Sequence, residues 1–241
     1  MATRGGATPL WQAIAAGLRT DISEGRYAPG DRLPTEADLS ERFGVNRHTV
    51  RHALSRLVEE GLVRTRRGSG AFVTARPTEY PIGARVRFHR NVLAAGRTPD
   101  KRVLQIERRA ATEAEARLLE LPAGQEICVY HGLSLADGMP IALFESHFPL
   151  SRLPGLDIYL AEVTSVTEAL RRAGVADYTR ATTRLTAMAA TAVQALHLHC
   201  REGDPVLYST GINIDAQGRP VEYGMTWFAG ERVTLTLDTR T

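Results

Sequence analysis

Apolar residues in the N-terminal part of the chain recur every three to four residues, the spacing of helices with one buried face. The spacing predicts a helix that ends near Gly25, a short helix from Thr35 to Phe43 and a longer helix after Asn46. The predicted buried positions are Leu10, Ile14, Leu18 and Ile22 in the first helix and Val50, Ala53, Leu54, Leu57 and Val58 in the third.

The third predicted helix has a polar face opposite its apolar stripe. Gly44 can supply the positive φ of a tight turn before it, and Asn46 is a favourable N-cap. The polar face carries His48, Arg51, His52 and Ser55, with Arg47 in the first turn. A helix anchored on one side that offers cations and donors on the other is typical of helix–turn–helix proteins.

A short hairpin is predicted after the third helix. Residues 62–66 alternate as a strand, residues 67–70 contain two glycines for a turn, and residues 71–73 return. Three helices followed by a hairpin with a basic tip predict a winged helix–turn–helix in residues 1–75. Residues 76–81 contain two prolines that interrupt the pattern, and we expect them to form a linker.

Residues 82–241 contain an internal repeat. Thr112 and Thr191 each open a predicted helix as a capping box, and a glycine, a strand, a turn and a second strand follow at matching intervals. The second strand ends at Phe148 in the first repeat and at Phe228 in the second. Further elements are predicted as helices at 83–95 and 165–174 and a strand at 178–189. The pattern predicts an α+β domain in which two halves share an antiparallel sheet with flanking helices.

The charge of the chain is close to balanced but unevenly distributed. The formal net charge is +3, yet residues 1–76 hold 12 Arg against 8 Asp or Glu, so a surface for a polyanion is expected in this part. The only cysteines, Cys128 and Cys200, lie far apart and suggest neither a disulfide framework nor a zinc site. The sequence shows neither a leader nor a long apolar run, so we expect a cytoplasmic protein without membrane contact.

Four stretches resemble the GntR family of bacterial repressors: residues 25–36, 39–51, 57–63 and 67–73. The resemblance implies a winged helix–turn–helix that binds double-stranded DNA at an inverted-repeat operator. It implies DNA contacts from Thr35, Glu36, Asn46, Arg47, His48, Thr49, Arg51, Arg67 and Gly68. One position departs from the family, because Ala37 stands where an arginine is frequent.

Residues 80–238 resemble the UTRA ligand-binding domain of the HutC subfamily, which has a chorismate-lyase-like fold. The opening of this part, from Arg76 to Gly96, is similar to that of repressors of phosphonate-utilisation genes. The resemblance implies a homodimer that responds to a small anionic effector such as a phosphonate or phosphate.

The effector site is expected from two groups of residues. Arg85, Arg87 and His89 lie near a predicted helix N-terminus, where free N–H groups and the helix dipole favour an anion. The two repeats contribute Glu145, His147, Glu222 and Tyr223 at similar places, although His147 and Tyr223 can equally be core residues. Gly132, Ser134 and Ala229 stand where the family often has arginine, which argues against a ligand held like a sugar phosphate.

Two other functions remain open at this stage. One is a repressor of the same type for an unrelated effector, such as an amino acid or sugar derivative. The other is a chorismate-lyase-like enzyme. The sequence argues against it, because no catalytic triad, metal-ligand set or nucleotide loop is recognisable. His197 and His199 have no third ligand in the sequence pattern. We therefore expect a regulator that is not an enzyme and that needs no cofactor or metal.

Overall fold

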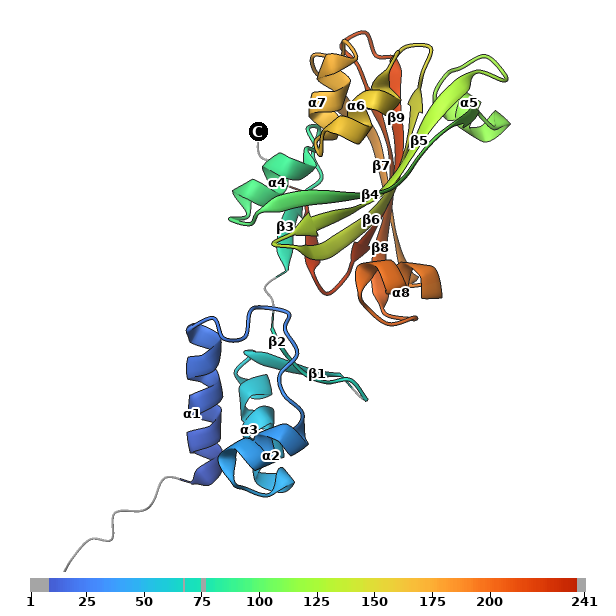
Figure 1. Cartoon of the computed structure of the whole chain (residues 1–241). Helices are drawn as coiled ribbons and strands as arrows, with labels where there is room; N and C mark the ends of the chain where they lie inside the picture. Colours follow the sequence, from blue (N-terminus) through green and yellow to red (C-terminus); the bar gives the residue numbers. More distant parts are fainter. Residues whose placement is uncertain (1–8, 67, 75–76, 238–241) are drawn as a thin grey trace, which may run out of the picture. The chain divides into compact units, whose positions relative to one another are not determined.

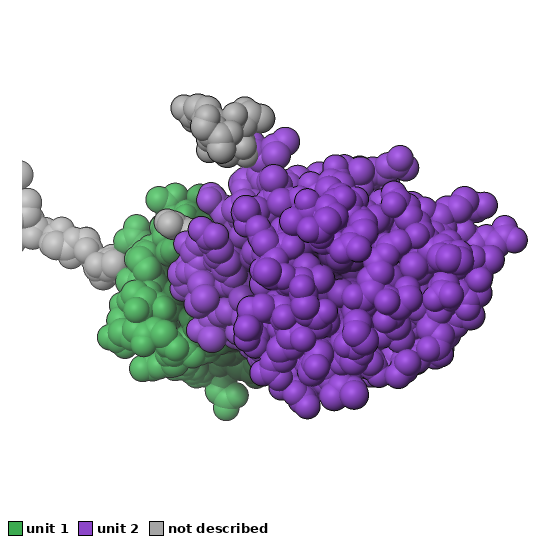
Figure 2. All heavy atoms as spheres, turned by 90° about the horizontal axis from the view of Figure 1, so that it is seen from above, with its two compact units in different colours: residues 1–76 green, residues 77–241 purple. Residues whose placement is uncertain are grey.

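The computed structural model describes residues 9–66, 68–74 and 77–237. The chain divides into two compact units, residues 1–76 (unit 1) and 77–241 (unit 2) (Figure 1, Figure 2).

Unit 1 is a winged helix–turn–helix. It consists of α1 (Leu10–Ser23), α2 (Glu36–Phe43), α3 (Arg47–Glu59), β1 (Val63–Arg66) and β2 (Gly70–Val73), with β1 and β2 paired as an antiparallel hairpin. Leu18, Leu39 and Leu57 are fully buried at the centre of the three helices. Two predicted core positions are wrong, because Leu10 is 65% exposed at the start of α1 and Val58 is 37% exposed near the end of α3.

The short α2 is fixed at both ends by its own sequence. The Thr35 hydroxyl accepts from the Asp38 N–H, and the Asp38 carboxylate accepts from the Thr35 N–H, as in a capping box. Gly44 ends the helix with φ of 64°, a conformation that costs glycine little. These two ends set the angle at which α3 begins.

Unit 2 is built on a six-stranded antiparallel sheet with the order β4-β5-β6-β9-β8-β7. The strands are β4 (Pro99–Ala110), β5 (Glu126–Ala136), β6 (Met139–Pro149), β7 (Thr179–Ala189), β8 (Pro205–Ile214) and β9 (Pro220–Ala229). The two halves of the repeat meet where β6 pairs with β9 at the centre. The strand predicted at 178–189 is β7 at one edge of the sheet, whereas β4, which occupies the matching position at the other edge, was not predicted.

Helices cover both faces of this sheet (Figure 1). On one face lie α6 (Leu156–Glu162) and α7 (Val166–Arg172), packed on residues such as Tyr130 and Phe144. On the same face lies α4 (Phe88–Ala94), packed with Ala142 and Phe228. On the other face lie α5 (Glu113–Leu118) and α8 (Ala192–Leu198), packed on residues such as Val129 and Leu143. The capping boxes predicted at Thr112 and Thr191 are present at the starts of α5 and α8.

Two predictions for the start of unit 2 are wrong. Most of the expected linker, residues 76–81, is the strand β3 (Thr78–Pro81), which pairs in parallel with β10 (Val233–Thr236) at the other end of the unit. A strand of four residues with a distant partner leaves no local periodicity to detect. The helix expected at 83–95 begins only at Phe88 and has seven residues, and the Ala84 carbonyl before it accepts a hydrogen bond from the Arg180 N–H of β7. None of the described helices is long and apolar enough to cross a membrane.

Candidate functional site

The first turn of α3 presents polar side chains on the surface of unit 1. Asn46 caps the helix, with its Oδ1 atom 2.8 Å from the Thr49 N–H nitrogen and 2.9 Å from the Thr49 hydroxyl. Arg47 and His48 follow the cap and are exposed. Asn46 and Thr49 are thus engaged in building the helix start, whereas Arg47 and His48 are free to contact another molecule.

Arg51 is already held by a carboxylate from α2. Its guanidinium forms two hydrogen bonds with Glu36, the shorter at 2.7 Å, and this pairing lowers the pKa of Glu36. The pair joins two residues for which the family resemblance implies DNA contacts. Arg51 therefore has to share its charge between Glu36 and any phosphate or base.

The remaining residues of the polar face of α3 and of the hairpin turn differ in their surroundings. His52, expected on the polar face, stacks on Trp11 with ring centroids 4.4 Å apart and so contributes to the packing of α1 against α3. Gly68 adopts φ of 74° in the hairpin turn. Arg67 lies outside the described residues.

A cavity of about 370 Å³ lies in unit 2, between the sheet and the helices α4 and α7. Its walls come from residues 80–90, from the start of α7 and from one face of the sheet. The charged side chains that line it are Arg87, Arg90, Lys101, Arg180 and Glu222. Four cations thus face a single carboxylate, which makes the cavity a favourable environment for an anion.

Lys101 on β4 is enclosed by aromatic rings. Its ammonium lies 4.4 Å from the ring centroid of Phe144, 5.6 Å from that of Phe88 and 5.7 Å from that of Tyr130. Burial lowers the pKa of the Lys101 ammonium to about 8, although the charge of Glu222 acts in the opposite direction. Within residues 77–237, no carboxylate forms an ion pair with it. The positive charge is therefore poorly solvated and poorly compensated.

Arg180 and Glu222 complete the polar floor of the cavity. The Nε atom of Arg180 is buried and has no hydrogen-bond partner among the described residues. Glu222 on β9 accepts from the Ser146 hydroxyl of β6 at 2.7 Å and from the Asn213 amide of β8. Glu222 is thereby held by the two strands that flank its own.

The two arginines expected to bind an anion at a helix start are instead paired with an acid. Asp177 accepts from Arg85 at 2.6 Å and from Arg87 at 2.9 Å, and the Arg87 guanidinium lies 3.4 Å from the ring centroid of Tyr178. Hydrogen bonding to Arg85 lowers the pKa of Asp177. Arg85 precedes α4 and does not line the cavity, whereas Arg87 and His89 do. The predicted anion site at this helix start is therefore not formed as expected.

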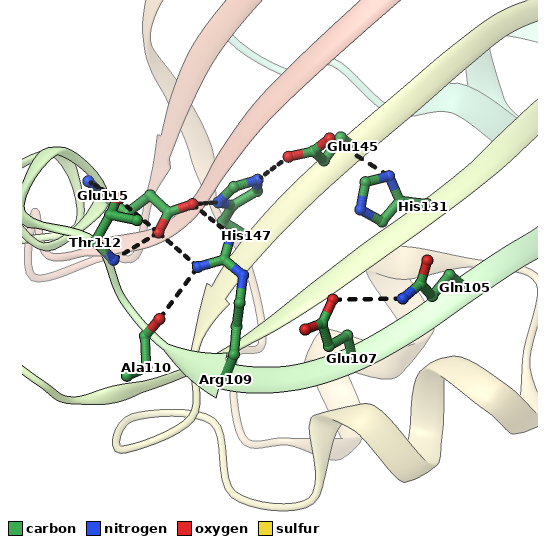
Figure 3. Close-up of polar contacts among 9 residues, drawn as sticks. All are labelled: Gln105, Glu107, Arg109, Ala110, Thr112, Glu115, His131, Glu145 and His147. Atoms are coloured by element: carbon green, nitrogen blue, oxygen red, sulfur yellow. Dashed lines mark hydrogen bonds and ion pairs between the residues drawn. The ribbon is translucent and has the colours of Figure 1, made fainter. Parts of the chain in front are cut away.

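Glu145, His147 and Tyr223 lie on the opposite face of the sheet. Glu145 and His147 belong to a network around Glu115 (Figure 3). The buried His147 ring lies between two carboxylates, 2.8 Å from Glu115 and 2.6 Å from Glu145. Arg109 forms two hydrogen bonds with Glu115 at 2.6 and 2.8 Å, and the Tyr223 ring meets the His147 ring edge-on at 5.6 Å. Hydrogen bonding to Arg109 lowers the pKa of Glu115 to about 2.

The seven residues predicted for the effector therefore do not form one site. Arg87, His89 and Glu222 line the cavity, Arg85 lies outside it, and Glu145, His147 and Tyr223 are on the far face. Adjacent residues of a strand point to opposite faces of the sheet, so Glu222 and Tyr223 cannot belong to the same site although they are neighbours in the sequence. The cavity residues that the prediction missed include Lys101, Ser146, Arg180 and Asn213. One signal was available, since Lys101 is the only lysine of the chain.

Two family descriptions match the chain. Residues 10–73 match "Bacterial regulatory proteins, gntR family", and residues 94–234 match the UTRA domain. Together they cover α1 to β2 of unit 1 and most of unit 2.

Several proteins of similar length resemble the whole chain. The uncharacterized HTH-type transcriptional regulator RB1450 of Rhizobium meliloti (strain 1021) is 36% identical over 231 residues, 95% of each chain. The probable transcriptional regulator PhnF of Escherichia coli (strain K12) is 31% identical over 95% of this chain and 94% of that protein. The HTH-type transcriptional repressor NagR of Bacillus subtilis (strain 168) is 30% identical over 94% of this chain and 93% of its own.

The fold is shared with a solved structure. The crystal structure of PhnF from Mycobacterium smegmatis superposes with a TM-score of 0.65 over 95% of this chain and 99% of that chain, at 24% identity. The observed folds of the two units agree with the two family matches and with the fold of this solved structure. The chain therefore belongs to the GntR family as a HutC-type member with a UTRA domain, and it is a DNA-binding transcriptional regulator rather than an enzyme.

Proposed function

We propose that the chain is a homodimeric repressor that binds an inverted-repeat operator and controls phosphonate uptake or utilisation genes in response to a small anionic effector. The resemblance of residues 76–96 to repressors of phosphonate-utilisation genes supports the link to phosphonates. The proposal that the effector is an anion is supported by the cavity, which is lined by four cationic side chains and one carboxylate.

The DNA contact is assigned to the exposed start of α3. Arg47, His48 and Arg51 offer donors and positive charge at the helix end that enters a major groove in such domains. Replacing Arg51 with alanine should weaken operator binding by about 1–3 kcal/mol if the side chain reads a base. Gel shifts with Arg47→Ala and Arg51→Ala proteins would test this, and unchanged operator affinity in both would remove α3 from the recognition role.

The effector is proposed to act through linkage. A ligand that binds one arrangement of the dimer more tightly must change operator affinity by the same factor that the operator changes ligand affinity. Calorimetric titration of phosphate, methylphosphonate and 2-aminoethylphosphonate into the full-length protein tests the ligand class. Binding of an uncharged metabolite, with none of the three binding at millimolar concentration, would favour an amino acid or sugar derivative instead.

A further inference from the structure

The internal repeat places a cation at the same position in each half of unit 2. Thr112 and Thr191, which open the two repeat helices, are 79 residues apart, and the same separation relates Lys101 on β4 to Arg180 on β7. Their cross-strand partners correspond as well, because Lys101 pairs with Ser134 and Arg180 pairs with Asn213. The two cations are thus equivalent residues on the two edge strands, and both line one cavity.

Equivalent glycines leave room beside these cations. A Cβ atom on Gly132 would lie 2.6 Å from the Phe144 ring, on which the Lys101 ammonium rests. A Cβ atom on Gly211 would lie 1.9 Å from Nη1 of Arg180. The two halves of unit 2 therefore correspond both in the cation and in the glycine that leaves room near it.

Neither cation forms an ion pair with another of the described residues. Within residues 77–237, Lys101 contacts aromatic rings rather than a carboxylate, and Nε of Arg180 is buried without a partner. A buried polar or charged group without a partner is costly, so a site with two such groups gains from binding anions. Arg87 is a weaker candidate, because Asp177 and Tyr178 already engage its guanidinium.

The carboxylate of Glu222 lies in the middle of the same floor. It is held by Ser146 on β6 and Asn213 on β8, while the Lys101 ammonium lies over Phe144 of β6 and Arg180 lies over Gly211 of β8. A single oxyanion placed centrally to reach both cations would be repelled by Glu222. Two oxyanions at the two ends would avoid that repulsion and each gain a charge-assisted hydrogen bond.

We propose that Lys101 and Arg180 are the anion-binding residues of the effector cavity, and that the effector is a small molecule with two anionic groups, one for each half of the repeat. This inference rests on the proposed function, because it specifies the anionic ligand of the same cavity. The short spacer between the two groups contacts the apolar wall formed by Phe88, Phe144 and Phe228.

A series of ligands of increasing length tests the proposal. Methylphosphonate, phosphonoacetate, 3-phosphonopropionate and 4-phosphonobutyrate are titrated calorimetrically into the full-length protein. At least one of the three phosphonocarboxylates is expected to bind tenfold or more tightly than methylphosphonate. If methylphosphonate binds as tightly as the best of them, one anionic group suffices, and the proposal fails while the anionic effector stands. If none of the four binds at millimolar concentration, the anionic effector fails as well.

Substitutions assign the two ends. Lys101→Met and Arg180→Gln should each reduce the affinity of the best phosphonocarboxylate at least tenfold, to about the level of methylphosphonate. Arg102→Met and Arg184→Gln remove a charge from exposed positions of the same two strands and should leave affinity unchanged. Thermal unfolding confirms that each variant is folded. Wild-type affinity in either cavity variant would overturn the assignment of that residue.

Discussion

The two faces of the six-stranded sheet use the same kinds of charged residue in opposite ways. On the face covered by α5 and α8, Arg109, Glu115, His147 and Glu145 contact one another within 2.6–2.8 Å (Figure 3). On the cavity face, Lys101 and Arg180 have no ion pair among the described residues. Charges that satisfy one another contribute to stability, whereas charges left unsatisfied at a cavity are available to a ligand.

The largest expected effect comes from breaking the paired face. Glu115→Gln should lower the free energy of unfolding by about 3 kcal/mol at neutral pH, because the pKa of Glu115 is lowered to about 2 in the folded state. A carboxylate whose pKa is lowered stabilises the fold above its unfolded pKa and loses this effect as the pH falls through its folded pKa. The difference between wild type and variant should therefore shrink between about pH 4.5 and pH 2.

Urea unfolding at several pH values measures this difference. Ligand affinity should be unchanged in Glu115→Gln, because the residue lies on the other face from the cavity. A variant as stable as wild type at neutral pH would show that the network does not stabilise the fold.

A second prediction concerns the space beside Arg180. Gly211→Ala should destabilise unit 2 by about 1–3 kcal/mol, because the added Cβ meets Nη1 of Arg180 and the backbone oxygen of Thr182 at 2.8 Å. It should also weaken binding of the effector by displacing the guanidinium. Gly224→Ala on β9 is the matched control for stability, since the atom nearest to its added Cβ, Oε1 of Glu222, would lie at an ordinary 3.5 Å. Equal stability in the two variants, or wild-type ligand affinity in Gly211→Ala, would contradict the role of Gly211.

The third prediction is a gain in stability, the opposite of the loss expected for Glu115→Gln. Lys101→Met should stabilise the protein by about 1–2 kcal/mol at pH 7. Burial of the ammonium lowers its pKa to about 8, and the loss of its contacts with the aromatic rings offsets part of the gain from removing the buried charge. For a base, a lowered pKa means that the charged form is disfavoured in the folded state. The cost is greatest below pH 8 and disappears as the pH rises toward the unfolded pKa of lysine, about 10.4. The gain in the variant should therefore fall between pH 8 and pH 10.

Ligand affinity in the same variant sharpens this comparison. Above about pH 8 wild-type Lys101 loses its proton, so the ratio of wild-type to Lys101→Met affinity for a phosphonocarboxylate should decline. Titration of the ligand itself affects both proteins equally. Of the groups that share the cavity, burial lowers the pKa of His89 and raises those of Tyr80 and Tyr178, and Arg87, Arg180 and Glu222 also line it. A ratio independent of pH would exclude Lys101 as the titrating anion contact.

The smallest expected effect concerns a charged pair in unit 1. This pair resembles the network around Glu115 in being formed and resembles the cavity cations in being available to a ligand. Arg51 and Glu36 are paired but exposed, so solvent screens the pair and it contributes little to stability. Glu36→Gln should leave stability nearly unchanged and raise the affinity for random DNA a few-fold, since it frees the Arg51 charge for phosphate. Fluorescence anisotropy at several salt concentrations measures this affinity. Weaker binding to random DNA in the variant would show that Glu36 positions Arg51 rather than competes for it.

Local features of the fold could be predicted from the sequence, and long-range ones could not. The caps at Thr35, Asn46, Thr112 and Thr191 are fixed by residues within one helical turn, and the structure contains all four. The strand β3 escaped prediction because its partner, β10, lies at the other end of unit 2.

The cavity was harder to predict because its residues come together only in the folded sheet. Lys101 and Arg180 lie on opposite edge strands, and irregular register in β4 and β7 disturbs the alternation that would assign their faces. The basic residues around the start of α4 drew attention to Arg85 and Arg87, yet the acid that neutralises both, Asp177, stands before β7. The repeat was the usable signal, since it relates Lys101 to Arg180 once the edge strands are included.

The pairing of β3 with β10 also affects the order in which the chain folds during synthesis. Every strand pair and buried cluster of unit 1 is formed by residues before Thr74, so unit 1 can fold soon after it leaves the ribosome. Unit 2 begins with a strand whose partner starts at Val233, so it cannot close until nearly the whole chain has been made. A transcript that ends before Val233 would thus encode a folded DNA-binding unit joined to a unit 2 that lacks its closing strand.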